Sequence, residues 1–372
     1  MTDFDIQTPR GQLAWLLSEV TTALQITPTQ YDLAVQRYET VGGWIDRCLE
    51  DRAVTIYPQG SMALQTTVKP RGNEEYDLDL VLEIQALGLT DPMILYSLVH
   101  DALASHGMYR EILEPKKRCL RLNYAGEFHM DILPAVPDVA AVEPGAILVP
   151  DRQLRTWSAS NPRGFRQWFE DQCAEAAILQ KRAQVEPLPP NDDAQRKALL
   201  QQVVQLVKRN RYEWFAGHED APRSVVLTTL AGHAYHGESD LFGALLAVLN
   251  RIVAWSDVPP GRVLEVHNPT NPRELFSESW AAKPQSFDAF RQWVRVLRDR
   301  VARLTELHGA TLDAELDDLF GERIMNIARV KFGERLQAAR EANRLRFSRG
   351  SLTTAASGAT IRSNRFYGGT EK

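Results

Sequence analysis

The sequence predicts an α+β protein in which helices are followed by a lobe built on a β-sheet and then by a helical lobe. Three observations predict this class. Apolar residues at helical spacing open the chain, alternating segments bounded by turn residues fill roughly residues 66–136, and helical periodicity dominates from about residue 160 to residue 347. The chain contains no internal repeat.

The first part of the chain is expected to hold two helices and then the strands. Apolar residues recur at helical spacing from Leu13 to Leu24, and a second run follows from about Pro28 to Leu49. Turn signals at residues 71–73 and 125–126 separate alternating segments, and residues 92–107 have helical periodicity. The expected strands are residues 66–70, 76–84, 118–124 and 128–136.

The second part is expected to be helical. Asn161-Pro162 is typical of a helix start, because proline is favoured in the first turn. Residues 187–193 break the pattern, and Asp192 or Asp193 could cap a helix that continues from Leu199 to Val207. Further helices are predicted at residues 223–238, 240–256, 286–307 and 322–347.

These elements divide the chain into three parts. We expect a first domain with the N-terminal helices and the strands over residues 1–155 and a helical domain over residues 156–347. Small polar residues after Ser348 predict a flexible tail over residues 348–372. Its aromatic pair, Phe366 and Tyr367, is consistent with a docking segment or with a frayed end.

Composition excludes several classes of protein. Of the 372 residues, 44% are hydrophobic and 24% are charged, which is typical of a folded chain. Three widely spaced cysteines exclude a disulfide scaffold and a cysteine-rich zinc site, and they fit a reducing cytoplasm. No apolar run approaches the length of about 18 residues that predicts a membrane span, and the first residues do not form a signal peptide. A cytoplasmic location without membrane attachment is therefore expected.

Charge is unevenly distributed along the chain. The net charge is −5, and residues from Asn343 onward carry six basic residues and one acidic residue, so the remainder has 37 basic and 47 acidic residues, or −10. An acidic body argues against broad binding to duplex nucleic acid, which usually requires a basic face.

The strongest chemical signal is a pair of aspartates in the expected strand 76–84. Side chains alternate along a strand, so Asp77 and Asp79 project from one face and their apolar neighbours from the other. Adjacent carboxylates repel each other, and a hard divalent cation such as Mg²⁺ offsets this repulsion. Two such ions roughly 3.5–4 Å apart are the usual arrangement for in-line phosphoryl displacement. A D-x-D pair alone is more often structural than metal-binding.

Two further segments fit the same chemistry. Asp131 lies in the expected strand 128–136, so three carboxylates would converge if this strand pairs near the first one. Gly60 lets the backbone approach a phosphate, and Ser61 can donate to phosphate oxygens. The Walker pattern GxxxxGK[ST] does not occur. Each signal is weak alone, but Gly-Ser, a strand, D-x-D and a third aspartate form a specific order.

Other candidates have simpler explanations. His233 and His236 have the spacing of a ligand pair on a helix, but packing or surface placement explains them better, because no third ligand is evident. His129 shares the face of Asp131 and could tune that carboxylate, but partial burial without such a role is the simpler interpretation. The remaining aromatic and sulfur-containing candidates are expected in the core or at the interface between lobes: Trp157, Trp168, Trp214, Cys119 and Cys173.

Taken together, these motifs resemble the bacterial cGAS/DncV-like nucleotidyltransferases (CD-NTases) of the DNA polymerase β-type superfamily. The similarity spans roughly residues 10–345. The matching segments are Gln59-Gly60-Ser61, Thr66-Thr67-Val68, Tyr76–Asp79, Asp131–Pro134 and, in the helical part, residues 160–169, 206–215, 222–231 and 268–280.

The resemblance implies a polymerase-β-like nucleotidyltransferase lobe with a mixed sheet, packed on a helical lobe that completes a nucleotide cleft. It implies the use of ribonucleoside triphosphates and Mg²⁺ or Mn²⁺ to make a cyclic di- or trinucleotide second messenger in antiphage (CBASS-type) signalling. By position, the catalytic and metal-binding residues are Asp77, Asp79 and Asp131, and the nucleotide-binding residues are Gln59, Gly60, Ser61, Asp77, Lys208 and Ser224.

Chemistry supports the two positions in the helical part. A lysine can act as a compact charge for a γ-phosphate, and Ser224 lies near an expected helix start, where amides bind anions. A snorkelling surface lysine is the alternative for Lys208. The segment NRFYGG resembles tails that a ubiquitin-like conjugation enzyme joins to a target, although Thr370-Glu371-Lys372 follows it.

Two other functions fit the same residues. One is nucleotidyl transfer to an RNA end, a protein or a small molecule. The other is a catalytically silent nucleotide sensor, in which one carboxylate of the three would be expected to be missing; all three are present.

Overall fold

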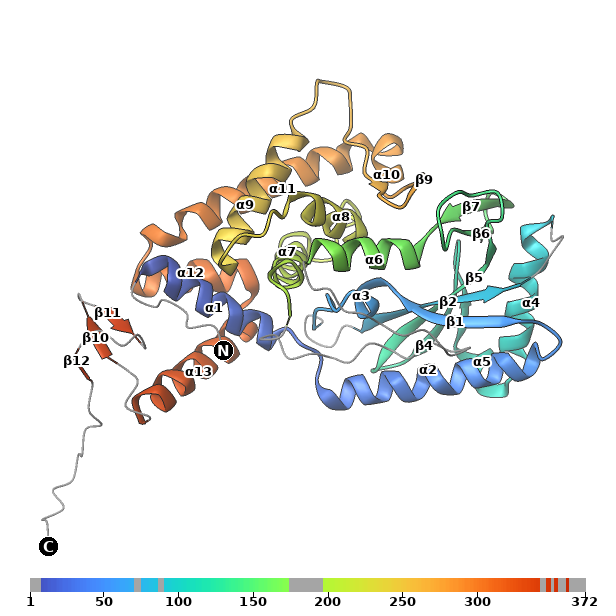
Figure 1. Cartoon of the computed structure of the whole chain (residues 1–372), viewed down its shortest axis with the longest axis horizontal. Helices are drawn as coiled ribbons and strands as arrows, with labels where there is room; N and C mark the ends of the chain where they lie inside the picture. Colours follow the sequence, from blue (N-terminus) through green and yellow to red (C-terminus); the bar gives the residue numbers. More distant parts are fainter. Residues whose placement is uncertain are drawn as a thin grey trace, which may run out of the picture.

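A β-sheet half and a helical half make up the molecule (Figure 1). The computed structural model describes residues 8–69, 75–85, 90–173, 197–341, 346–348, 351–353 and 359–360. The predicted α+β class and its order along the chain are confirmed. Among the residues described, no helix is both long and apolar enough to pass through a bilayer.

The sheet combines parallel and antiparallel strands. Its main order is β1 (Val54–Gln59), β2 (Tyr76–Ile84), β5 (Phe128–Pro137), β4 (Leu120–Tyr124) and β3 (Leu113–Pro115). β2 and β5 run parallel, and the other neighbours are antiparallel. β6 (Ile147–Asp151) pairs with the end of β5, and β7 (Thr156–Ser160) pairs with β6.

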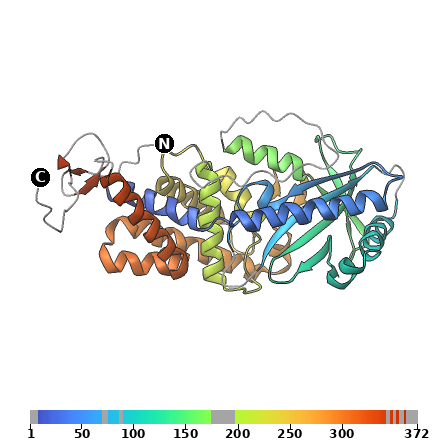
Figure 2. The ribbon, with the colours of Figure 1, turned by 90° about the horizontal axis from the view of Figure 1, so that it is seen from below.

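Helices cover the sheet and share its apolar core. α2 (Pro28–Cys48) lies across the sheet in Figure 2, and α4 (Pro92–Ala104) and α5 (Gly107–Ile112) lie near its far end. Thr27 begins α2 with a capping box, in which its hydroxyl accepts from the Gln30 amide at 3.2 Å. Buried residues of α2, α4 and the strands form one cluster, so one face of the sheet is sealed and polar side chains are left to the other.

The helical half has its own core. It comprises α6 (Pro162–Gln172), α7 (Leu199–Phe215), α8 (Ser224–Ala234), α9 (Leu241–Ser256), α10 (Glu278–Ala282), α11 (Pro284–Arg303), a 3₁₀ turn (Leu304–Glu306), α12 (Gly309–Phe320) and α13 (Glu322–Glu341). A hairpin of β8 (His267–Asn268) and β9 (Asn271–Leu275) lies between α9 and α10. β10 (Arg346–Ser348), β11 (Ser351–Thr353) and β12 (Ala359–Thr360) form a small separate sheet.

The first helix belongs to the helical half. Leu13, Leu17 and Val20 of α1 (Pro9–Ala23) are buried in the same cluster as α7, α9 and α11. The next helix, α2, contributes to the core of the sheet half. The chain therefore starts in one half and crosses at about residues 24–27 to build the other. The boundaries of the three predicted domains stay a prediction.

Several local expectations need correction. The predicted strand 66–70 is wrong for its described residues 66–69, because helix α7 supplies the hydrogen bonds that a neighbouring strand would have given: Gln205 Nε2 donates to the Thr67 carbonyl at 2.7 Å. The predicted helix 92–107 is split at Ser105 and His106, and the predicted helix 223–238 ends at Ala234. The predicted helix 322–347 is wrong at its end, since residues 346 and 347 belong to β10. The sequence patterns do not predict β1, β3, β6, β7, the β8–β9 hairpin or β10–β12.

Some expectations fall on residues outside those described. They are residue 70 of the predicted strand 66–70, the turn at residues 71–73, the break at residues 187–193, with Asp192 and Asp193, and most of the tail, including Phe366, Tyr367 and residues 368–372.

Candidate active site

The fold brings the three aspartates together on two neighbouring parallel strands. In the register of β2 and β5, Asp79 lies opposite Asp131 and Asp77 lies opposite His129. The predicted alternation is confirmed, since Leu78, Met130 and Ile132 on the opposite face are fully buried. Core packing of these apolar residues therefore fixes the direction in which the carboxylates project.

Gly60 directly contacts this group of carboxylates. β1 pairs Gln59 with Asp79, and the chain then turns at Gly60 into the one-turn helix α3 (Gly60–Ala63). Gly60 has a φ of +64°, and a Cβ there would lie 2.1 Å from Asp79 Oδ2. Only glycine therefore permits this approach. The Ser61 and Thr67 hydroxyl oxygens are 3.2 Å apart, which fixes the loop that follows.

Burial and the neighbouring negative charges raise the pKa of the two aspartates of β2. Burial, followed by the charges of Asp131 and Asp77, raises the pKa of Asp79 from 3.8 to about 7. Burial also raises the pKa of Asp77, while the positive charge of Arg121 opposes this shift. Concentrated negative charge at the end of a strand is the electrostatic condition that a divalent cation relieves.

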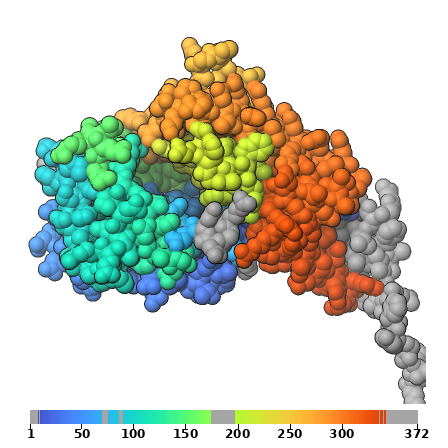
Figure 3. All heavy atoms as spheres, turned by 180° about the vertical axis from the view of Figure 1, so that it is seen from behind, coloured from blue at the N-terminus to red at the C-terminus, as the bar shows by residue number. Residues whose placement is uncertain are grey.

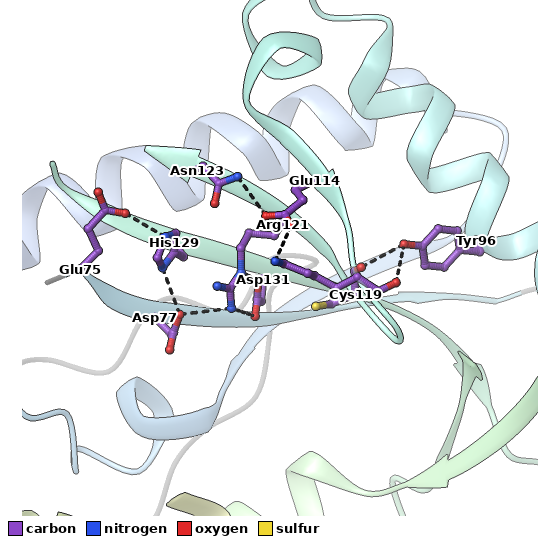
Figure 4. Close-up of polar contacts among 10 residues, drawn as sticks. Glu75, Asp77, Tyr96, Glu114, Cys119, Arg121, Asn123, His129 and Asp131 are labelled. Carbon is purple, nitrogen blue, oxygen red and sulfur yellow. Dashed lines mark hydrogen bonds and ion pairs between the residues drawn. The ribbon is translucent and has the colours of Figure 1, made fainter. Parts of the chain in front are cut away.

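Arg121 is the main residue that sequence reasoning missed. It lies on β4 opposite Asp131 and donates to both carboxylate oxygens, from Nε to Oδ1 at 2.7 Å and from Nη2 to Oδ2 at 2.8 Å (Figure 4). Nη2 also lies 3.3 Å from Asp77 Oδ1. The available signal was its position between Leu120 and Leu122, which places a cation on the polar face of a strand.

His129 has different partners from those expected. Its Nε2 lies 2.9 Å from Glu75 Oε2 and its Nδ1 lies 3.5 Å from Asp77 Oδ1, whereas no contact with Asp131 is found (Figure 4). It therefore bears on Asp77 rather than on Asp131. Cys119, predicted to be buried, is only partly so, while Cys173 is buried as expected.

Lys208 approaches the carboxylates from the helical half. It is buried in α7, and its Nζ donates to Thr66 Oγ1 at 3.0 Å and to the Thr66 carbonyl at 3.3 Å. Burial lowers the pKa of Lys208 to about 7, and the charge of Asp79 opposes this shift. The alternative of a snorkelling surface lysine is therefore wrong.

A cavity of about 400 Å³ lies between the two halves. Seen from behind, the surface is hollowed between the green and blue sheet half and the yellow and orange helical half (Figure 3). Asp131 is not among the residues that line the cavity, and both of its oxygens face Arg121. The predicted residues that line it are Gln59, Gly60, Ser61, Asp77, Asp79, Lys208 and Ser224, the first residue of α8.

An ionic chain crosses the cavity wall. Glu278 of α10 accepts from Arg118 Nη2 at 3.3 Å and from Arg223 Nη1 at 3.0 Å. Arg118 precedes β4 in the sheet half and also donates to Asp151 at 3.3 Å, while Arg223 precedes α8. Both arginines line the cavity. The two halves are thus joined by charged groups next to the space that a ligand would fill.

The donor set suits a hard metal ion, although its present arrangement does not form a metal-binding cluster. Within the described part of the chain, no three His, Cys, Asp or Glu side chains are disposed to hold a metal. The reason is visible at Asp131, whose two oxygens both face Arg121. Three carboxylates on adjacent strands, one with a pKa raised by burial and by the charges of the other two, still fit Mg²⁺ in number and chemistry.

The other candidates do not form sites. His233 of α8 packs against Trp168, with ring centroids 4.9 Å apart, and His236 lies beyond the end of the helix, so the two do not share a helical face. Trp168 packs against the helical core and Trp157 against the sheet core. Trp214 is 41% exposed, so of its two expected positions, the core or the interface between lobes, the core is wrong.

Comparison with known proteins gives one consistent family. The model of the Second Messenger Oligonucleotide or Dinucleotide Synthetase domain matches residues 14–172. A c-di-GMP synthase of Roseivirga ehrenbergii is 32% identical over 315 residues, covering 82% of this chain and 83% of that protein. The cyclic dinucleotide synthase CdnG of Bradyrhizobium diazoefficiens is 29% identical over 349 residues, covering 86% of this chain and 83% of that protein.

A solved structure extends the similarity to three dimensions. The Bradyrhizobium diazoefficiens CD-NTase CdnG in complex with GTP superimposes with a TM-score of 0.72 at 28% identity. The alignment covers 87% of this chain and 99% of that chain. Both the sheet half and the helical half therefore have counterparts in one known structure.

Proposed function

We infer the function from the family: this chain belongs to the cGAS/DncV-like nucleotidyltransferases and is therefore a nucleotidyltransferase that makes a cyclic nucleotide second messenger. We propose that it joins two ribonucleoside triphosphates, GTP among them, into a cyclic dinucleotide. The proposal for GTP rests on the relatives, two of which are named for c-di-GMP synthesis or solved with GTP. A cavity of about 400 Å³ between the halves is of the size of a nucleotide-binding site.

One observation carries this proposal. Two carboxylates from β2 and one buried lysine from α7 line the same cavity from opposite sides, and Asp131 adjoins them. Phosphoryl transfer requires a protein mainly to position the reactants and to neutralise charge. Asp77, Asp79 and Asp131 would hold Mg²⁺ or Mn²⁺, which when bound supplies Lewis-acid polarisation of the phosphate oxygens.

The protein residues have separate tasks in this scheme. Gly60 and Ser61 offer backbone and hydroxyl donors to the phosphates of the donor nucleotide, with Gln59 beside them. Lys208 supplies a compact positive charge from α7, and Ser224, at the start of α8, lines the same cavity.

The bond changes then follow. The acceptor ribose hydroxyl forms a P–O bond to the donor α-phosphorus, the bond to the bridging oxygen breaks, and pyrophosphate leaves. The hydroxyl proton would pass to Asp131 once the Arg121 guanidinium has moved away from its two oxygens. A second transfer of the same kind closes the ring.

The biological setting is also part of the proposal. We expect a cytoplasmic enzyme that acts in CBASS-type antiphage signalling, without broad binding to duplex nucleic acid. Conjugation of the tail by a ubiquitin-like conjugation enzyme stays a prediction, because the residues concerned lie outside those described. A trinucleotide product and transfer to an RNA end, a protein or a small molecule are the alternative outcomes.

The test is to incubate the purified protein with labelled ribonucleotides and Mg²⁺ and to identify the products by mass spectrometry. We expect a phosphatase-resistant cyclic dinucleotide without any added acceptor, and its loss in Asp77→Ala/Asp79→Ala. Product that persists unchanged in the double variant would remove these aspartates from the reaction. Nucleotide binding without turnover under all metal conditions would favour a silent sensor.

A further inference from the structure

Arg121 occupies the space between two of the aspartates. Its guanidinium donates to both oxygens of Asp131, at 2.7 and 2.8 Å, and Nη2 also reaches Asp77 Oδ1 at 3.3 Å. The Arg121 side chain is 22% exposed and that of Asp131 is 15% exposed, so this pair is largely shielded from solvent. A cation therefore already bridges the carboxylates from β5 and β2 (Figure 4).

We propose that Arg121 is a built-in counter-cation that a divalent metal ion must displace, so that the guanidinium and the metal are alternative occupants of the gap between Asp131 and Asp77. This inference rests on the proposed function, since it concerns the metal site of that reaction. It assigns to Arg121 the role of a positioning residue, which acts through the two carboxylates and not on the nucleotide.

For two physical reasons, the guanidinium and a metal ion cannot occupy this gap together. A bidentate arginine–carboxylate pair directs one N–H to each oxygen and is among the strongest side-chain contacts. A hard metal ion requires the same oxygens and the same negative charge. Since arginine stays protonated under all ordinary conditions, the guanidinium cannot leave by losing its proton and must instead move away.

The structure also offers the displaced guanidinium a second partner. Glu114 of β3 lies directly opposite Arg121 of β4 in the antiparallel register. Directly opposed side chains have Cβ atoms about 4.5–5.5 Å apart and lie on the same face of the sheet. Glu114 is about half exposed. Its Oε1 accepts from Lys116 at 2.6 Å, whereas among the described residues its Oε2 accepts only from Asn123 at the longer distance of 3.4 Å, so Oε2 is accessible to a further donor. Arg121 therefore stands between two acidic partners, one at the metal site and one outside it.

Binding of Mn²⁺ in the absence of nucleotide, followed by electron paramagnetic resonance, tests this inference independently of catalysis. In Arg121→Gln we expect Mn²⁺ to bind about tenfold more tightly than in the wild type, since a charge-assisted contact no longer competes. In Glu114→Gln we expect weaker binding of about two- to threefold, because the displaced guanidinium loses its second partner. The effect of Glu114→Gln should disappear in the Arg121→Gln background, as a double-mutant cycle reveals.

The matched control is Arg118→Gln, which removes a positive charge from the wall of the cavity; Arg118 contacts Asp151 and Glu278 and none of the three aspartates. It should change the affinity for Mn²⁺ by less than about twofold, since its charge is not in contact with them. Thermal unfolding of each variant checks that the fold is retained, and Arg121→Lys gives a second variant that keeps the charge without the bidentate fork.

Weaker or unchanged Mn²⁺ binding in folded Arg121→Gln would overturn the inference, because it would mean that Arg121 holds Asp131 in place for the metal or has no bearing on it. Product formation is scored separately. Wild-type synthesis with unchanged Mn²⁺ affinity in the variant therefore refutes only this inference, whereas tight Mn²⁺ binding without any product refutes only the proposed function.

Discussion

Substitution of Gly60 by alanine places a methyl group where Asp79 now stands. The new Cβ would lie 2.1 Å from Asp79 Oδ2 and 2.9 Å from its Cγ, whereas ordinary van der Waals contact begins at 3.4 Å. The carboxylate or the Gly60 loop must therefore shift by about 1.3 Å, the difference between 3.4 and 2.1 Å. The backbone is strained as well, since the φ of +64° is unfavourable for any residue with a Cβ.

These two effects have different magnitudes and different readouts. The left-handed conformation should lower the free energy of unfolding by about 1–2 kcal/mol. Misplacement of a catalytic group by about 1 Å reduces rates by about 100-fold, so we expect kcat for product formation to fall by roughly that factor. The Tm should fall by only a few degrees, while activity should be almost lost.

Gly261→Ala is the matched control. Gly261 has a similar φ of +80°, but nothing lies within 4 Å of its added Cβ. It should show the same loss of stability in a thermal scan and retain wild-type kcat in the product assay. If folded Gly60→Ala keeps its kcat within about threefold of the wild type, the reasoning that Asp79 must stay in place against Gly60 is refuted.

Three other predictions follow from the charged groups of the cavity. The pKa of Asp79 is raised to about 7 in the folded protein, so the unfolded chain loses this proton at a lower pH than the folded protein does, and stability falls as the pH rises from about 4 to 7. Asp79→Asn should therefore raise the Tm of the metal-free protein more at pH 8 than at pH 5. An equal rise at both pH values would contradict the shifted pKa. The pKa of Lys208 is lowered to about 7, so Lys208 is largely neutral at pH 8, and binding of the anionic GTP beside it should take up as much as about one proton. Calorimetry in buffers of different ionisation enthalpy measures this uptake. Uptake that persists in Lys208→Met would assign the proton to another group. Removal of divalent metal with a chelator should abolish product formation and Mg²⁺ or Mn²⁺ should restore it, so synthesis that continues in chelator would exclude a metal held by the three aspartates.

The face of the carboxylates could be predicted from the sequence because it depends on a fixed period. Alternation along a strand is set by covalent geometry, so Asp77 and Asp79 had to share a face once Leu78 was buried. The sequence predicts that Asp131 joins the other two aspartates only if β2 and β5 are neighbours, and it does not show that they are. The structure shows this pairing, with Asp79 opposite Asp131.

The role of Arg121 could not be predicted in the same way. Its partner depends on the register between β4 and β5, which local patterns do not fix. The prediction of a strand at residues 66–69 is wrong for a related reason. The backbone carbonyls of Thr66 and Thr67 are bound by Lys208 and Gln205, about 140 residues away in the chain. Partners at such distances emerge only from the packing of the two halves.

The position of α1 has a consequence for protein engineering. Thr21 donates to Gln202 at 3.2 Å and Gln25 donates to Gln205 at 3.3 Å, so the start of the chain braces the same helix that carries Lys208. The two halves are interlocked rather than arranged in series. A chimera that exchanges the helical half between relatives should therefore transplant the first 23 residues together with it, because a junction placed only near residue 160 would separate α1 from the core it completes.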